Sequence, residues 1–270
     1  VPGIAKTLTA KVLAKTLSVD FSRIQFTPDM MPSDIIGTSV FNMKDSEFKF
    51  KKGPIFTNIA LIDEINRAPA KTQAALFEVM EERQITYDGT TYKLDFPFLV
   101  IATQNPIEQE GTYRLPEAQL DRFLFKINLL HPSLSEEQEI LRRYKSNTRI
   151  DFDVIQSIFS KQDLEKIQET LAGIRIEDSV IKYIAEITHE TRVHGKIYLG
   201  ASPRASLSML KASKAMAAIR GRDFVIPDDV QYVAYHVLNH RIILTPEAEM
   251  EGMDAVLVIQ EIIKKVEVPR

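Results

Sequence analysis

The spacing of apolar residues divides the chain into two parts. Up to about residue 130, segments with helical spacing alternate with segments typical of strands. From about residue 164 onward, almost every segment is an amphipathic helix punctuated by Gly and Pro. This order predicts an α/β domain with a parallel sheet over residues 1–145, followed by a smaller all-helical domain over residues 146–270.

Several elements of the first part can be assigned individually. The run IALIDE at 59–64 is apolar until two final carboxylates and is typical of a strand buried on both faces. Asp88-Gly89 between alternating residues predicts a hairpin over 85–94. The other expected elements are helices at 4–17 and 70–82, a strand at 96–106 and a hairpin at 40–56.

The composition narrows the class of protein. With 44% hydrophobic and 26% charged residues, the chain is typical of soluble globular proteins. A net charge of -3 gives no bulk reason to bind nucleic acid or an anionic membrane. The absence of Cys excludes disulfides and thiolate chemistry and suits a reducing cytosol, so we expect a cytoplasmic protein. No apolar stretch approaches the roughly 18 residues that a membrane helix needs.

The opening VPGIAKTL places Lys6 and Thr7 after a Pro-Gly turn and before a helical pattern. With one glycine before Val1, it would depart from the phosphate-loop pattern G-x-x-x-x-G-K-[ST] only at Ala5. Because there is no initiator Met, we expect the chain to begin inside a longer product, after the first glycine and strand of that motif. Backbone N–H groups at a helix start bind phosphates, Lys6 adds a cation, and Thr7 offers a hydroxyl to Mg²⁺. The alternative is a turn that caps a surface helix.

The strand at 59–64 delivers Asp63 and Glu64 at its carboxyl end. Nucleotide hydrolysis needs one group to organise the metal and one to orient or deprotonate water, and this pair can divide that work. Both acids would lie at the sheet edge where ligands bind. Alternatively, they form only a solvated strand end.

Three further residues are candidates. Asn105 follows the second buried strand, where its amide could hold water or the γ-phosphate, although Asn-Pro is more often a turn. Arg122 lies on a short amphipathic segment and either acts as an arginine finger or pairs with a surface acid, Glu117 or Asp121. Arg204 follows a proline at a helix start, where the helix dipole disfavours a cation unless a phosphate compensates it.

The strings PGIAKT, LIDEINRAP, ATQNP, LPEAQLDRF and GASPRA occur in this order, and together they resemble the MoxR family of AAA+ ATPases. The resemblance extends from Val1 to about Arg241. Members often read A-K-T at the loop, which accounts for Ala5.

The resemblance implies a role for each matching residue. Lys6 and Thr7 correspond to the Walker A pair, Asp63 and Glu64 to the Walker B pair, and Asn105 to sensor 1. Arg122 corresponds to a finger acting on the neighbouring subunit, and Arg204 to sensor 2. Thr7 and Asp63 would hold Mg²⁺. The remaining residues implied to line the nucleotide are Pro2, Gly3, Ile4, Ala5 and Leu8.

The resemblance also implies an activity. We expect Mg²⁺-dependent ATP hydrolysis in a homo-oligomeric ring, usually a hexamer. Such proteins are thought to act as chaperone-like remodelers of partner proteins, often of proteins with von Willebrand factor A domains. The two hairpins resemble the helix-2 insertion and pre-sensor-1 hairpin of the clade that also holds the magnesium-chelatase ATPase subunit. Membrane insertion and nucleic-acid binding are not expected.

Other interpretations remain open at this stage. A small-molecule phosphotransferase would share the loop but need no arginine from a second subunit, and a nonhydrolysing switch would not need Glu64. A DNA-handling AAA+ motor or a magnesium-chelatase-like subunit is the alternative function. Arg67 either senses nucleotide or pairs with Glu64, and the lysines of the 40–56 hairpin either grip a polymer or form the wet side of a two-faced hairpin. His236 and His240 have metal-ligand spacing, but Val237 stands where a zinc hydrolase carries Glu.

Overall fold

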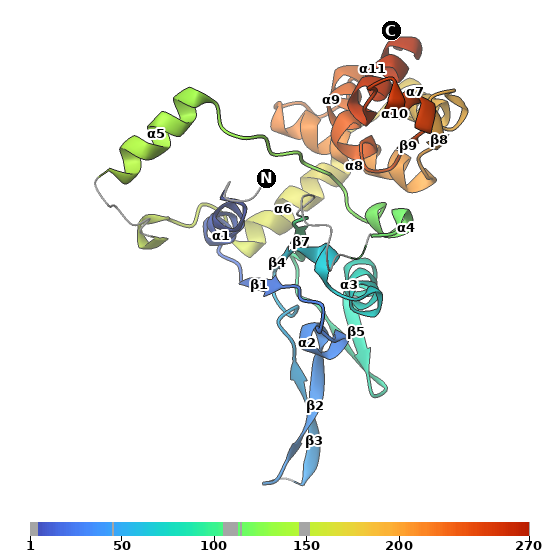
Figure 1. The fold of residues 1–270 in the computed structure, drawn as a ribbon. Coiled ribbons are helices and arrows are strands. Elements are labelled where there is room, and N and C mark those ends of the chain that lie inside the picture. Colours follow the sequence, from blue (N-terminus) through green and yellow to red (C-terminus); the bar gives the residue numbers. More distant parts are fainter. Residues whose placement is uncertain (1–4, 45, 105–112, 114, 146–151, 270) are drawn as a thin grey trace. The chain divides into compact units, whose positions relative to one another are not determined.

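The computed structural model describes residues 5–269 except 45, 105–112, 114 and 146–151 (Figure 1). The chain forms two compact units. Residues 1–115 and 128–165 make up the α/β unit, and residues 116–127 and 166–270 make up the helical unit. The boundary expected at residue 145 stays a prediction.

A three-stranded parallel sheet forms the centre of the α/β unit, in the order β1 (Phe21–Gln25), β4 (Ile59–Asp63), β7 (Leu99–Ala102). The first four residues of β4 are apolar and buried, as the sequence pattern predicts. Gln25 pairs in register with Asp63, and Ile62 with Ala102. The carboxyl ends of all three strands therefore lie at one edge of the sheet.

In the described residues up to 115, three α-helices accompany this sheet: α1 (Lys6–Thr16), α2 (Pro32–Ile36) and α3 (Ala70–Glu82). The α3 helix has the bounds predicted from its spacing and buries Leu76, Phe77 and Val79. A short 3-10 helix, η1 (Ile65–Arg67), connects β4 toward α3. Of these helices, α1 packs against β4 and β1, and α2 packs against α3.

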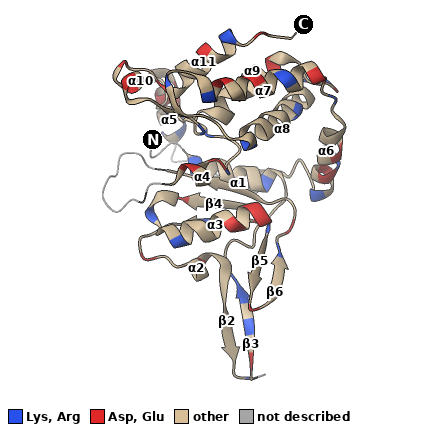
Figure 2. Cartoon of the chain, turned by 90° about the vertical axis from the view of Figure 1, so that its right-hand side faces the viewer, with Lys and Arg blue, Asp and Glu red and all other residues tan. Residues whose placement is uncertain are grey.

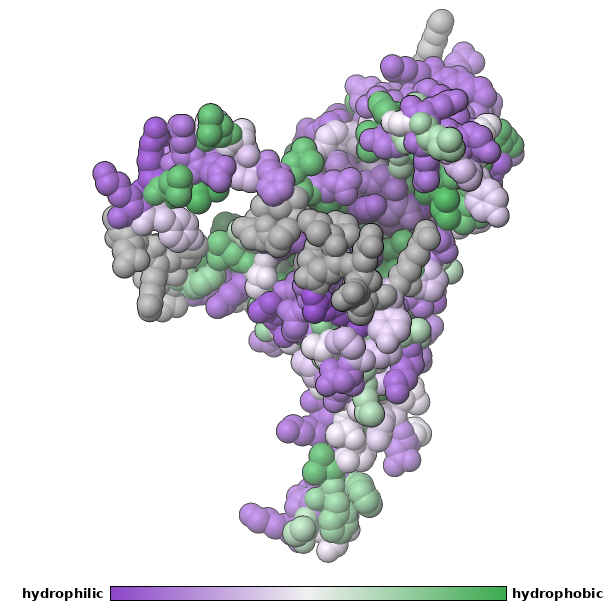
Figure 3. All heavy atoms as spheres, in the orientation of Figure 1, coloured by the Kyte–Doolittle hydropathy of each residue, from purple (hydrophilic) through white to green (hydrophobic). Residues whose placement is uncertain are grey.

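Both predicted hairpins are present: β2 (Gly37–Asn42) pairs with β3 (Glu47–Lys52), and β5 (Gln84–Tyr87) pairs with β6 (Thr90–Lys93). Phe50 of the long hairpin stacks on Tyr92 of the short one, with ring centroids 4.6 Å apart. Toward the tip, Phe41 and Phe48 are exposed, so the apolar side of the long hairpin is itself open to solvent (Figure 3). Its lysines lie mainly on β3 (Figure 2).

The described part of residues 128–165 contains helices joined by irregular chain. Helix α5 (Leu134–Tyr144) begins with the capping box that Ser133 and Glu136 form. A second 3-10 turn, η2 (Phe152–Val154), follows, and α6 (Lys161–Gly173) continues into the helical unit.

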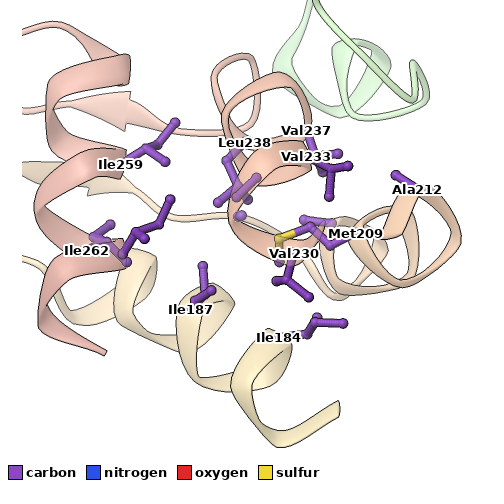
Figure 4. Close-up of a cluster of buried hydrophobic side chains, with 14 of the residues drawn as sticks. Ile184, Ile187, Met209, Ala212, Val230, Val233, Val237, Leu238, Ile259 and Ile262 are labelled. Carbon is purple, nitrogen blue, oxygen red and sulfur yellow. The ribbon is translucent and has the colours of Figure 1, made fainter. Parts of the chain in front are cut away.

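The helical unit has one apolar core (Figure 4). Helix α8 packs against α7 and α9, and α11 packs against the same two helices. Ile187, Met209 and Ile259 are fully buried at these contacts. One small antiparallel pair interrupts the all-helical pattern, β8 (Ile197–Leu199) with β9 (Ile243–Leu244). The unit's helices are α4 (Glu117–Leu120), α7 (Asp178–Val193), α8 (Pro203–Ile219), α9 (Pro227–Leu238), α10 (Pro246–Met250) and α11 (Ala255–Lys265).

Among the described residues, no helix combines the length and the apolar character that crossing a bilayer requires.

Candidate functional site

Asp63 closes β4 and is held from two sides. The Thr103 hydroxyl donates to Asp63 Oδ1 at 2.5 Å, and Arg23 of β1 donates to Oδ2 from Nη2 at 2.7 Å. Burial alone would raise the pKa of Asp63. The hydrogen bonds from Thr103 and Arg23 and the charges of Arg23 and Lys6 outweigh burial, so this pKa lies below its usual value. The carboxylate is therefore ionised at neutral pH.

Glu64 begins the 3-10 turn in a left-handed backbone conformation, with φ 57° and ψ 53°. A non-glycine residue adopts this conformation at a cost. Glu64 Oε2 accepts a hydrogen bond from the Gln25 amide at 2.9 Å and lies 3.0 Å from Arg67 Nε. Of the two interpretations of Arg67, the structure thus contains the salt bridge with Glu64.

Thr103 connects the two acids. Besides donating to Asp63, its hydroxyl oxygen accepts the backbone N–H of Glu64 at 3.0 Å. Its own backbone is fixed to the sheet, because its N–H donates to Ile62 O and its carbonyl accepts the N–H of Ile65. One buried hydroxyl therefore helps to lower the pKa of Asp63 and also fixes the position at which Glu64 leaves the strand.

The start of α1 supplies the candidate phosphate loop. Ala5 precedes the helix in the left-handed conformation, with φ 57° and ψ 22°, where glycine is favoured. The position at which this sequence departs from the phosphate-loop pattern thus has a backbone that suits the missing glycine. Lys6 opens the helix and lies near enough to Asp63 for its charge to lower that residue's pKa. Thr7 and Leu8 follow in the first turn.

The remaining candidates lie elsewhere. Arg122 and Arg204 belong to the helical unit. Arg122 follows Asp121 in the chain, and Arg204 Nη1 lies 3.8 Å from Asp121 Oδ2. Of the two surface acids considered for pairing, Asp121 is engaged with other arginines. Pro2, Gly3, Ile4 and Asn105 lie outside the described residues.

Sequence reasoning missed Arg23, Gln25 and Thr103, three residues that contact the acids. It did not identify β1, so Arg23 and Gln25 had no place on the sheet. Thr103 stands inside the string ATQNP, two residues before the predicted site residue Asn105. A signal existed, because a polar residue directly after an apolar parallel strand lies at the ligand edge of the sheet.

The donor set suits a nucleotide with its metal ion. Asp63 and Glu64 offer carboxylate oxygens, and Thr7 offers a hydroxyl, which are the hard oxygen ligands that Mg²⁺ prefers. The helix start at Lys6 supplies backbone N–H groups and a cation for phosphates. These residues thus fit Mg²⁺ and a polyphosphate together.

The parallel sheet with this loop and acid pair, together with a helical second unit, defines an ATPase of the AAA class. Residues 1–125 match the family model described as ATPase family associated with various cellular activities (AAA). Residues 189–262 match the model of the AAA lid domain. The second match identifies the helical unit as a lid.

Relatives specify the family further. The protein Chaperone MoxR1 of Mycobacterium tuberculosis is 44% identical over all of this chain and 73% of its own length. The uncharacterized protein YeaC of Bacillus subtilis is 48% identical over 100% of this chain and 83% of its own. A crystal structure of a candidate ATPase from Cytophaga hutchinsonii, 48% identical, superposes with a TM-score of 0.92 over 100% of this chain and 84% of that one. The chain belongs to the MoxR family of AAA+ ATPases.

Magnesium-chelatase subunits match more distantly, for example at 26% identity over 68% of this chain for the homologue from Methanocaldococcus jannaschii. The expected fold and the MoxR-type ATPase function are confirmed, and the chelatase-like interpretation remains the alternative.

Proposed function

We propose that the chain hydrolyses ATP in a Mg²⁺-dependent reaction at the interfaces of a homo-oligomeric ring, and uses the energy to remodel a partner protein. The observation that carries the proposal is the position of the Thr103 hydroxyl at the carboxyl edge of the sheet. It donates to Asp63 and accepts the N–H of Glu64, and the charge of Lys6 also acts on Asp63. An ionised Asp63, followed by Glu64 and within reach of the charge of a lysine at a helix start, suits a metal–triphosphate complex.

The residues divide the work. Backbone N–H groups at the start of α1 and the Lys6 ammonium bind the phosphates. Asp63 and Thr7 would hold Mg²⁺, which neutralises phosphate charge when bound. Glu64, which already accepts a hydrogen bond from Gln25, orients the attacking water and takes up its proton. Asn105 would assist this water.

Two arginines complete the proposal. Arg204 would reach the γ-phosphate from the lid of the same subunit. Arg122 would act on the nucleotide of the neighbouring subunit, an effect worth about 10³–10⁵ in rate. This division requires a ring, for which we propose six subunits.

The remodelling role rests on family membership and on the chaperone name of a relative. Proteins with von Willebrand factor A domains are the first partners to test. The Glu64→Gln variant supplies the trap, because it should hold ATP and its partner without turnover. Identification of the protein retained only with ATP would name the substrate.

Glu64→Gln also tests the hydrolysis itself. The amide cannot accept the proton of water, so we expect ATP to bind with unchanged Kd while turnover falls by about 10²–10⁴. Glu78→Gln, on the exposed face of α3, is the matched control and should leave both quantities unchanged. Equal turnover in Glu64→Gln and the parent protein would remove Glu64 from its role.

A further inference from the structure

Arg241, just beyond α9, has a guanidinium that is almost fully buried. Its side chain is 1% exposed. Burying an arginine is costly unless its donors are all used, and an apolar residue of similar volume often stabilises a core better. Core packing alone therefore does not explain Arg241, and the groups it contacts indicate what it does.

Most hydrogen bonds of the guanidinium go to one short segment, residues 121–124. Nε donates to Asp121 Oδ1 at 2.7 Å, and Nη2 donates to Asp121 O at 2.9 Å and to Phe123 O at 2.6 Å. Nη1 donates to Leu124 O at 3.1 Å and to Val237 O at 2.5 Å. Arg241 thus fixes the backbone on both sides of Arg122.

The two residues before Arg241 also bond to this part of the chain. His240 Nε2 lies 3.0 Å from Phe123 O, and the Asn239 amide donates to Lys126 O at 3.1 Å. Burial and the adjacent Arg241 lower the pKa of His240 to about 4, so the ring is neutral at neutral pH. Since a carbonyl only accepts, Nε2 carries the proton of this bond. Three consecutive lid residues therefore bond to residues 121–126, the stretch that carries Arg122.

Asp121 connects this segment to the start of α8. Its Oδ1 accepts from Arg241, while its Oδ2 accepts from the Ser202 hydroxyl at 2.8 Å. Ser202 is also the N-cap of α8 and accepts the N–H of Arg204. The segment is thus attached at two points of the helical unit, which leaves its backbone little freedom.

We propose that Arg241 is a positioning residue for Arg122: it locks the 121–124 backbone to the lid so that the Arg122 guanidinium is presented in one direction to the neighbouring subunit. The inference rests on the proposed function, because it needs Arg122 to act in trans. Its consequence is that a defect at Arg241 harms the site of the neighbour and spares the site of the subunit that carries it.

Arg241→Lys is the informative variant. Lysine keeps the charge but has three donors on one atom, which cannot reach all six acceptors around the planar fork, Ser208 Oγ at 3.3 Å included. We expect kcat to fall at least tenfold while the Kd for a fluorescent ATP analogue changes by less than about threefold, because preorganised charge acts mainly in the transition state.

Mixing experiments separate positioning from general damage. Arg241→Lys subunits have an intact Glu64, and Glu64→Gln subunits have an intact finger. In a random equal mixture, about a quarter of the interfaces combine the two intact parts, so activity should return to about that fraction of the parent rate. A lid that is merely misfolded would give no such return.

Two controls make each outcome decisive. Arg122→Ala mixed with Glu64→Gln tests action in trans by itself. Arg222→Lys alters another buried ion pair of the lid, that with Asp229, and should lower thermal stability without lowering kcat. Thermal unfolding of Arg241→Lys is measured alongside, so that rates are compared for folded protein only.

The outcomes distinguish the two proposals. Rescue of both Arg122→Ala and Arg241→Lys by Glu64→Gln supports the positioning role. Rescue of Arg122→Ala alone, or full kcat in folded Arg241→Lys, would overturn it and leave the proposed function standing. Failure of Arg122→Ala to be rescued at any ratio would overturn action in trans and the positioning role with it.

Discussion

The hydroxyl of Thr103 lies 2.5 Å from Oδ1 of Asp63, a short charge-assisted hydrogen bond at the edge of the parallel sheet. It is one of the contacts that keep the pKa of Asp63 low despite burial. Because the same oxygen accepts the N–H of Glu64, the contact also orders the second acid.

Thr103→Val should therefore lower kcat by about tenfold to a hundredfold, since a hydrogen bond to a charged group contributes about 1.5–3 kcal/mol. Loss of the donor raises the pKa of Asp63, so the acid limb of the pH–rate profile should move to higher pH. Thr103→Ser keeps the hydroxyl and should behave like the parent. An acid limb at the same pH in Thr103→Val would contradict the assignment.

Two substitutions at Ala5 are expected to affect nucleotide affinity differently. Its left-handed backbone costs a residue with a Cβ about 1–2 kcal/mol. Ala5→Gly should relieve that cost and keep nucleotide affinity, whereas the β-branched Ala5→Val should weaken it severalfold. Titration with a fluorescent ATP analogue measures both. Weaker binding by Ala5→Gly would show that the methyl group itself is needed.

The base of the long hairpin depends on Gly53. A Cβ at Gly53 would lie 2.2 Å from Ile35 O and 2.5 Å from Gly37 N, both rigid backbone atoms. Gly53→Ala should therefore destabilise the α/β unit by about 1–3 kcal/mol. Gly173→Ala meets no atom within 4 Å and should be neutral or stabilising by up to about 1 kcal/mol. Thermal unfolding compares the two, and equal midpoints would refute the steric argument.

Asp229 should make the lid sensitive to acid. Its carboxylate is fully buried between Arg220 and Arg222. Burial raises its pKa, but the hydrogen bonds from Arg222 and the Ile226 N–H and the charges of Arg222 and Arg220 lower it below the usual 3.8 overall. Because the pKa of Asp229 is lower in the folded protein than in the unfolded chain, its ionised carboxylate stabilises the fold above pH 3.8. That stabilisation is lost as the pH falls through the folded pKa.

Asp229→Asn should cost about 3–5 kcal/mol at neutral pH, because it leaves two arginines without their partner. The loss relative to the parent should shrink as the pH falls below 4. Chemical unfolding at a series of pH values measures this difference, and a loss independent of pH would argue against ionised Asp229.

Much of the fold could be predicted because local signals and burial agreed. The apolar run of β4 and the periodicity of α3 gave their positions, and the family motifs gave the lid. The strand β1 was missed because FSRIQ has only Ile24 fully buried, as expected at the edge of a short sheet. In the sequence its polar residues resemble those of an exposed segment, but in the folded chain Arg23 bonds to Asp63 and Gln25 bonds to Glu64.

The site shows the same limit. Asp63 and Glu64 are predicted site residues because two acids end an apolar strand. Arg241 could not be found, since a cation before Ile242 resembles a surface residue until the distant segment 121–124 folds onto it. Long-range partners, which no local pattern encodes, decide whether a charge is buried.

The stacking of Phe50 on Tyr92, and its contact with Tyr87 at 5.0 Å, has a mechanical consequence. Each such aromatic pair contributes about 0.5–1.5 kcal/mol beyond its buried area. These ring contacts therefore hold the base of the long hairpin against the short hairpin. Anything that bends the long hairpin must first unstack rings on the short hairpin, and that hairpin is followed along the chain by β7 and then by Thr103.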